Sequence, residues 1–169
     1  MRLYTKYTPF NKTGQRGFTL VEVLVALVVL SVGLLGMAKM VMVSAHSNDS
    51  AYLRSQATAL AYQAMDSMRA NLSASTTNGY ITPMGFMPAA AGNCAAYCPP
   101  PALALSDVYG WKQHLLKALP SGTGSITTSA TFPVIATVMV QWDDSAAQSV
   151  FNVNAGAFNQ KVILQTVLE

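Results

Sequence analysis

The sequence predicts an α+β protein in which a long N-terminal membrane-spanning helix packs on a small antiparallel β-sheet. Three features lead to this fold class. Residues 18–43 are almost entirely apolar, residues 51–70 carry a helical stripe of apolar side chains, and the last third of the chain shows strand-like alternation. A chain of 169 residues suits one globular domain. Helical segments followed by strands in such a chain are typical of α+β proteins.

The apolar segment of residues 18–43 is long enough to cross a membrane. Glu22 and Lys39 are its only charged residues, and the stretch from Val23 to Ala38 carries no charge. At about 1.5 Å per residue, the segment extends about 39 Å as a helix, which exceeds the ~30 Å hydrocarbon core of a bilayer. The alternative is a buried helix of a soluble protein. That helix would need a large apolar partner, which the rest of the chain does not supply.

Charge is distributed unevenly along the chain. The net charge is +3, yet residues 1–17 hold four basic and no acidic residues, whereas the remainder holds six basic and seven acidic residues. The basic character therefore belongs to the N-terminal segment, and no nucleic-acid partner is expected once this segment is removed. The positive-inside bias predicts that residues 1–17 stay in the cytoplasm and that the C-terminal part is translocated.

Residues 44–71 are predicted to continue the helix beyond the membrane. Residues 51–70 contain no glycine or proline, and apolar residues recur three or four positions apart at Leu53, Ala57, Leu60, Ala64 and Met68. Such a stripe is expected to pack on the C-terminal domain. The weakest positions of the whole helix are expected at Gly33, Gly36 and residues 47–50. Each glycine lowers helix stability by about 1 kcal/mol relative to alanine.

Residues 72–169 are predicted to form the globular α+β domain. Residues 71–105 are expected to be loop because they are rich in Asn, Ser, Gly and Pro. A helix is expected from Asp107 to Leu119, with Ser106 as its N-cap and Pro120 and Gly122 after its end. One face of this helix would be apolar, formed by Val108, Trp111, Leu115 and Leu119.

Strands are expected after this helix. In residues 134–142 one set of positions is apolar throughout and alternates with a second, mixed set, which predicts a strand. The first set is Val134, Ala136, Val138, Val140 and Trp142, and the second is Ile135, Thr137, Met139 and Gln141. Residues 125–132 and 161–168 are further strand candidates. Pro133 is expected to break a strand or to lie at an edge, because proline has no backbone N–H.

Cys94 and Cys98 are the only cysteines of the chain. In an oxidising compartment such as a bacterial periplasm, a pair four residues apart is expected to form a disulfide, with two free thiols as the alternative. A zinc site requires about four ligands. His46 and His114 are far away in sequence, so no metal ligands are expected, and both histidines are interpreted as surface or packing residues.

The string GFTLVEVLVAL, from Gly17 to Leu27, resembles the processing site of type IV pilins and related pseudopilins. In that family a membrane peptidase cuts after the glycine and then methylates the new N-terminal amine. The resemblance implies removal of residues 1–17 as a basic leader peptide, cleavage between Gly17 and Phe18, and methylation of Phe18. An ordinary secretory signal differs, because its cleavage site follows the apolar stretch.

Glu22 is a candidate assembly carboxylate. An unpaired charge within a membrane span is unfavourable by several kcal/mol, and such residues are functional candidates. Cleavage would leave an ammonium group on Phe18 and make Glu22 the fifth residue of the mature chain. The two opposite charges would attract strongly in a low dielectric, also between neighbouring subunits of a filament. The alternative is a Glu22 that is hydrated at the level of the lipid headgroups.

Further features resemble PilV-type minor pilins. They are the start FTLVEVLVALVVLSVGLLG, the helix ending MDSMRAN at residues 65–71, and a late strand with Trp142 and Asp143. The resemblance covers residues 14–71 well and residues 72–130 thinly. Major pilins often carry a proline where this chain has Lys39, and a C-terminal cysteine pair, whereas Cys94 and Cys98 lie mid-chain.

The resemblance implies a pilin-like fold and a minor pilin that helps to initiate type IV pilus assembly and to display tip components. Such pili serve cell adhesion and twitching motility. The implied partners are the prepilin peptidase and methyltransferase, other minor pilins, the major pilin and a tip adhesin. The implied location is the bacterial inner membrane, as a single-pass protein with a cytoplasmic N-terminus and a periplasmic C-terminal domain, and later the tip or base of the pilus.

Two other functions remain open from the sequence. One is a minor pseudopilin of type II secretion with the same architecture, and the other is a single-span anchored binding module that is never cleaved. No enzyme is expected, because the sequence lacks G-x-S-x-G, H-E-x-x-H and a glycine-rich phosphate loop. No cofactor is expected either.

Overall fold

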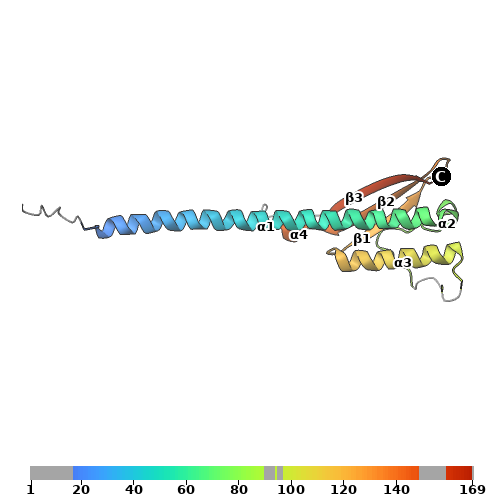
Figure 1. Ribbon diagram of the computed structural model, residues 1–169, viewed down its shortest axis with the longest axis horizontal. Helices are drawn as coiled ribbons and strands as arrows, with labels where there is room; N and C mark the ends of the chain where they lie inside the picture. Colours follow the sequence, from blue (N-terminus) through green and yellow to red (C-terminus); the bar gives the residue numbers. More distant parts are fainter. Residues whose placement is uncertain (1–16, 90–93, 95–96, 149–158, 169) are drawn as a thin grey trace, which may run out of the picture. The chain divides into compact units, whose positions relative to one another are not determined.

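The computed structural model describes residues 17–89, 94, 97–148 and 159–168 (Figure 1). The elements follow in the order α1 (Leu20–Ala70), α2 (Leu72–Thr76), α3 (Pro100–Ala118), β1 (Thr123–Thr128), β2 (Val134–Asp143), α4 (Ser145–Gln148) and β3 (Asn159–Leu168). Contacts divide the chain into one compact unit that ends at Met40 and a second that begins at Val41.

The first unit contains the apolar part of α1, and all its described side chains are exposed. This helix is long and apolar enough to cross a membrane. The helix runs without interruption through Gly33, Gly36 and residues 47–50. The three positions expected to be weak therefore do not break the backbone ladder of α1.

The second unit is built around the C-terminal part of α1. The predicted apolar stripe is confirmed, because Ala57, Leu60, Ala64 and Met68 are buried and Leu53 packs on the core in a partly buried position. Ala61 and Met65 are also buried and widen the stripe. This face of α1 packs against the domain core, as the spacing of its apolar residues predicts.

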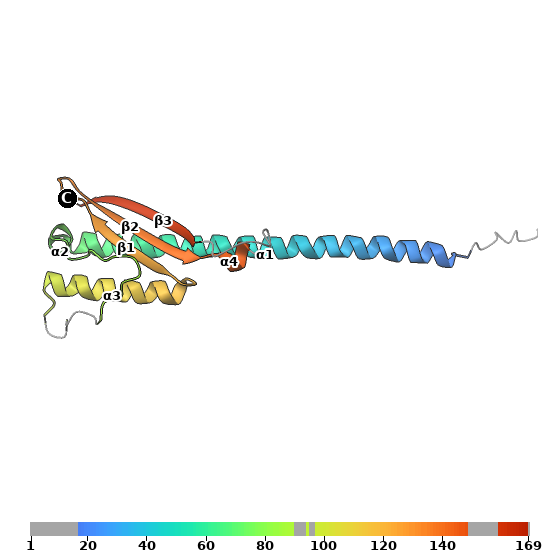
Figure 2. The ribbon, with the colours of Figure 1, turned by 180° about the vertical axis from the view of Figure 1, so that it is seen from behind.

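The sheet has three antiparallel strands in the order β1-β2-β3. Figure 2 shows the strands crossing the C-terminal part of α1. On β2 the side chains of Ala136, Val138, Val140 and Trp142 are buried, which confirms the predicted alternation. The α+β arrangement of a long helix on a small antiparallel sheet is thus the one the sequence predicts.

The strand expected at residues 125–132 is displaced, because β1 covers only Thr123–Thr128. The side chain of Ser129 explains where the ladder ends, since its Oγ accepts the backbone N–H of Ile135 at 2.8 Å. Pro133, which cannot donate a ladder hydrogen bond, lies in the connection between β1 and β2. The expected break at Pro133 is therefore confirmed. The candidate at 161–168 is confirmed as part of β3.

The start expected for the second long helix is wrong. Helix α3 begins at Pro100, and both Asp107 and the expected N-cap Ser106 lie inside it. Prolines at the first helical positions are compatible with a helix, because the first N–H groups have no intrahelical acceptor. The predicted apolar face is confirmed by the burial of Val108, Trp111, Leu115 and Leu119, which follows the end of α3.

The loop expected at residues 71–105 is also partly wrong. A short helix, α2, forms within it, and Ser75 of this helix donates a hydrogen bond from Oγ to the backbone oxygen of Met68 at 2.7 Å. Thr82 forms an isolated antiparallel bridge with Ile126 of β1. These tertiary contacts hold a segment whose local composition predicts irregular structure.

Candidate processing and assembly site

The junction between Gly17 and Phe18 precedes the first turn of α1 and is exposed. The Phe18 side chain is 83% exposed. A Cβ atom added at Gly17 would meet no atom within 4 Å. An exposed junction next to a helix start suits proteolysis, because a peptidase must bind the chain on both sides of the scissile bond. The leader residues 1–16 lie outside the described residues.

Thr19 caps the N-terminus of α1, a role that the sequence analysis did not assign. The backbone N–H of Glu22 donates to Oγ1 of Thr19 at 3.3 Å. A threonine N-cap followed by glutamate at the third helical position is the pattern of a capping box. The T-L-V-E string was a sequence signal for this cap. The same residues therefore define the start of the helix and form part of the resemblance to a processing site.

Glu22 lies in the first turn of α1 among exposed apolar side chains. A carboxylate in the first turn is favoured by the helix macrodipole. Glu22 forms no ion pair with any residue that the structure describes. In the uncleaved chain Phe18 has an amide nitrogen in place of an ammonium group, so the charge pair expected for the mature chain has no cation at this stage.

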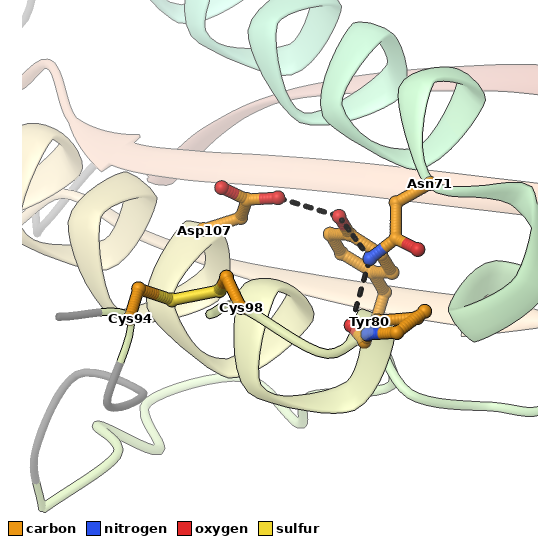
Figure 3. The surroundings of a disulfide bond; sticks show 6 residues. Asn71, Tyr80, Cys94, Cys98 and Asp107 are labelled. Carbon is orange, nitrogen blue, oxygen red and sulfur yellow. Dashed lines mark hydrogen bonds between the residues drawn. A yellow bond between two sulfur atoms is a disulfide. The ribbon is translucent and has the colours of Figure 1, made fainter. Parts of the chain in front are cut away.

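Cys94 and Cys98 are joined by a disulfide in the structure, with their Cα atoms 4.4 Å apart (Figure 3). Cys98 lies two residues before the start of α3. The disulfide therefore closes a tight loop at the entrance to this helix and lies far in sequence from the N-terminal junction.

The two histidines lie on different helices. His114 lies on α3 with Nδ1 3.4 Å from the amide nitrogen of Gln63 on α1, and His46 is a half-buried residue of α1. Among residues 17–89, 94, 97–148 and 159–168 there is no group of three or more side chains arranged to hold a metal ion.

Lys112 is a buried cation that the sequence analysis did not single out. Its side chain is 4% exposed, and Nζ donates to the backbone oxygens of Pro83 and Gly124 at 2.9 and 2.5 Å. Burial lowers the pKa of Lys112 from its ordinary value of 10.5 to about 8. Lys112 ties α3 to the segment before the disulfide loop and to β1, which is a structural role within the domain.

The comparisons with known proteins identify the N-terminal motif. A family model described as the prokaryotic N-terminal methylation motif matches residues 12–38, a range that contains Gly17, Phe18 and Glu22. No curated protein and no solved structure matches the chain. The motif indicates a prepilin of the type IV pilin-like class, which implies processing by a prepilin peptidase and assembly with other pilins. Proteins of this class are structural components and not enzymes.

Proposed function

We propose that this chain is a minor pilin of a type IV pilus that helps to initiate assembly and to display tip components. The observation that carries the proposal is the methylation motif at residues 12–38, which includes the start of an exposed apolar helix at Leu20. The PilV-like features at residues 65–71 and at Trp142 and Asp143 favour a minor pilin over the abundant subunit.

The precursor is an inner-membrane protein with four parts. Residues 1–17 are the cytoplasmic leader, residues 18–43 span the membrane, residues 44–71 continue the helix, and residues 72–169 form the periplasmic domain. The exposed apolar surface of α1 from Leu20 to Met42 supports this assignment, because so much apolar surface needs lipid or other helices around it. In the pilus, the same surface packs against neighbouring subunits.

Intact mass of the native protein tests processing. The mature chain should lack residues 1–17 and carry one extra methyl group on Phe18. Gly17→Leu should leave the full-length precursor in the membrane, because the peptidase requires a small residue before the cut. A mature protein that still begins at Met1 in a strain with active peptidase would contradict the proposal and favour an uncleaved anchored module.

We further propose that Glu22 pairs with the Phe18 ammonium group of a neighbouring subunit. Cleavage creates this cation four residues from Glu22, and both charges then lie at the end of an apolar helix where water is scarce. A charge pair in such surroundings is favourable when each partner is satisfied, and an unpaired charge is strongly unfavourable. The pair would fix the axial register of the subunits.

Glu22→Gln tests this pairing, because it keeps the shape of the side chain and removes its charge. Insertion and cleavage should be preserved, while the amount of this protein that co-purifies with sheared pili should fall. Asp49→Asn, on the exposed surface of α1, is the matched control and should enter pili normally. If Glu22→Gln enters pili as efficiently as the wild type, Glu22 is a passive interface residue.

A further inference from the structure

A cavity of about 150 Å³ with a mixed polar and apolar lining lies between α1 and α3 in the globular domain. Its apolar lining residues are Ala64, Val108, Trp111 and Ile126. Gln63 and Ser67 of α1 line it on one side, and Ser106, Asp107, Gly110 and His114 of α3 line it on the other. None of these residues belongs to the N-terminal motif, and no function has been assigned to them above.

Asp107 is held in place by a buried tyrosine. The hydroxyl of Tyr80 donates to Oδ2 of Asp107 at 2.5 Å and accepts a hydrogen bond from Nδ2 of Asn71 at 3.4 Å (Figure 3). Burial, reinforced by the hydrogen bond to Asp107, raises the pKa of Tyr80 above its usual range, so the tyrosine remains a donor. The other carboxylate oxygen of Asp107, Oδ1, accepts no hydrogen bond from the described residues.

Gly110 keeps the wall of the cavity open. A glycine in the middle of a helix is less stable than alanine by about 1 kcal/mol. Here the packing of the chain does not require it, because a Cβ atom at this position would meet no atom within 4 Å. Gly110 therefore lines the cavity beside open space, and a larger side chain at this position has room to project into it.

The lining favours a cation with several donors. Asp107 is the only charged residue among the described lining residues, which include neither lysine nor arginine. Ser67, Ser106 and Gln63 also line the cavity, and their side chains carry further acceptor oxygens. A guanidinium group has a planar set of five donors that matches a carboxylate and neighbouring oxygens better than the compact ammonium group of lysine.

We propose that this cavity binds the guanidinium group of an arginine side chain from a neighbouring subunit, with Asp107 as its counter-ion. The source of the arginine rests on the proposed function as a pilus component, whereas the binding of a guanidinium group does not. The site would fix the side of the domain on which a neighbouring subunit packs.

A titration of the full-length chain in detergent micelles tests the site. The probe is Nα-acetylarginine amide, and the neutral isostere Nα-acetylcitrulline amide is the matched control. Arginine amide should shift the NMR signals of the Trp111 indole and the His114 ring with millimolar saturation, while the signal of Trp142, which does not line the cavity, stays constant. Equal shifts with both probes, or no shift with arginine amide, would overturn the proposal.

Two variants test separately the negative charge of Asp107 and the open space of the cavity beside Gly110. Asp107→Asn keeps an acceptor for Tyr80 and should weaken arginine amide binding by about fivefold, the upper end of the range for a solvent-screened ion pair. Gly110→Leu should fill the cavity and abolish the shifts. Because leucine favours a helix more than glycine does, this variant should fold, and it tests the site even if Asp107→Asn does not fold. Asp66→Asn, an exposed residue of α1 outside the cavity, should bind as the wild type does. Equal weakening by Asp66→Asn would show a non-specific charge effect.

Photocrosslinking in cells tests the source of the arginine. A benzoylphenylalanine in place of Tyr109, a residue of α3 that does not line the cavity, should crosslink to a pilin-like subunit, in a peptide that contains arginine, and Asp107→Asn should reduce the yield. If arginine amide binds but no such peptide is captured, the neighbouring subunit is not the source. If the chain never enters pili, the proposed function fails while the titration result stands.

Discussion

The two halves of α1 are both rich in apolar residues but lie in different surroundings. Leu30 in the first half is 58% exposed, whereas Leu60 in the second half is 9% exposed. The first half is apolar on all sides, while the second has an apolar stripe with Arg54, Gln63 and Asp66 on its other faces. A helix that is apolar all round requires an apolar environment, and an amphipathic helix requires one packing partner.

The side chains of the two halves also differ in size. Leucine and valine dominate the first half, whereas the buried stripe contains three alanines, Ala57, Ala61 and Ala64. Small residues bring the backbone of α1 close to its neighbours, and the indole nitrogen of Trp111 donates to the backbone oxygen of Leu60 at 2.9 Å. The domain thus packs on its own half of α1, while lipid or other subunits must cover the other half.

Matched leucine truncations test this comparison most strongly. Leu60→Ala should lower the free energy of unfolding of the domain by about 2–5 kcal/mol, because it leaves a cavity in a packed core. Leu30→Ala should change it by less than about 0.5 kcal/mol, since no described residue buries Leu30. Denaturant unfolding of the full chain in micelles, followed by tryptophan fluorescence, gives both values. Equal losses would show that the two halves unfold together.

The buried Lys112 and the exposed Lys39 extend the comparison to the pH dependence of stability. Burial lowers the pKa of Lys112 to about 8 in the folded chain, so the unfolded chain binds more protons between about pH 8 and pH 10.5. The free energy of unfolding should therefore rise with pH in this window, by up to about 3 kcal/mol. The raised pKa of Tyr80 acts in the opposite direction above about pH 10, so the measurement belongs between pH 7 and pH 9.5.

Lys112→Met should remove this rise, because the titrating group is gone. Lys39→Met, in the exposed half of α1, is the control and should keep the rise. Denaturant midpoints at several pH values measure both variants. If the free energy of unfolding of Lys112→Met still rises with pH, another titrating group causes the rise.

Replacing the cysteine pair should have a smaller effect than Leu60→Ala. The disulfide closes a loop with a sequence separation of only four residues, so its loss should lower the free energy of unfolding by about 2 kcal/mol or less. Thermal unfolding of the Cys94→Ser/Cys98→Ser variant measures this. Non-reduced peptide mapping of protein from the periplasmic face should find the bond, and free, alkylatable thiols there would contradict it.

Local patterns predicted the parts of the fold that depend on periodicity. The stripe from Leu53 to Met68, the buried face of β2 and the apolar face of α3 all follow from the spacing of apolar residues. The start of α3 did not, because composition treated the Pro99–Pro101 run as loop, although proline is compatible with the first positions of a helix. The T-L-V-E string at residues 19–22 also predicts an N-cap at Thr19, although only Gly17, Phe18 and Glu22 were assigned roles in that segment.

The sequence by itself determined the N-terminal motif, the membrane-length helix and the order of the two long helices and the three strands, because each depends on the pattern of neighbouring residues. Only the tertiary structure placed Lys112 between the carbonyl groups of Pro83 and Gly124, and only it brought Tyr80 to Asp107 and left a cavity beside Gly110. These arrangements join residues that are far apart in the chain. Their burial and hydrogen bonds depend on how α1, α3 and the sheet pack, and no local pattern encodes that packing.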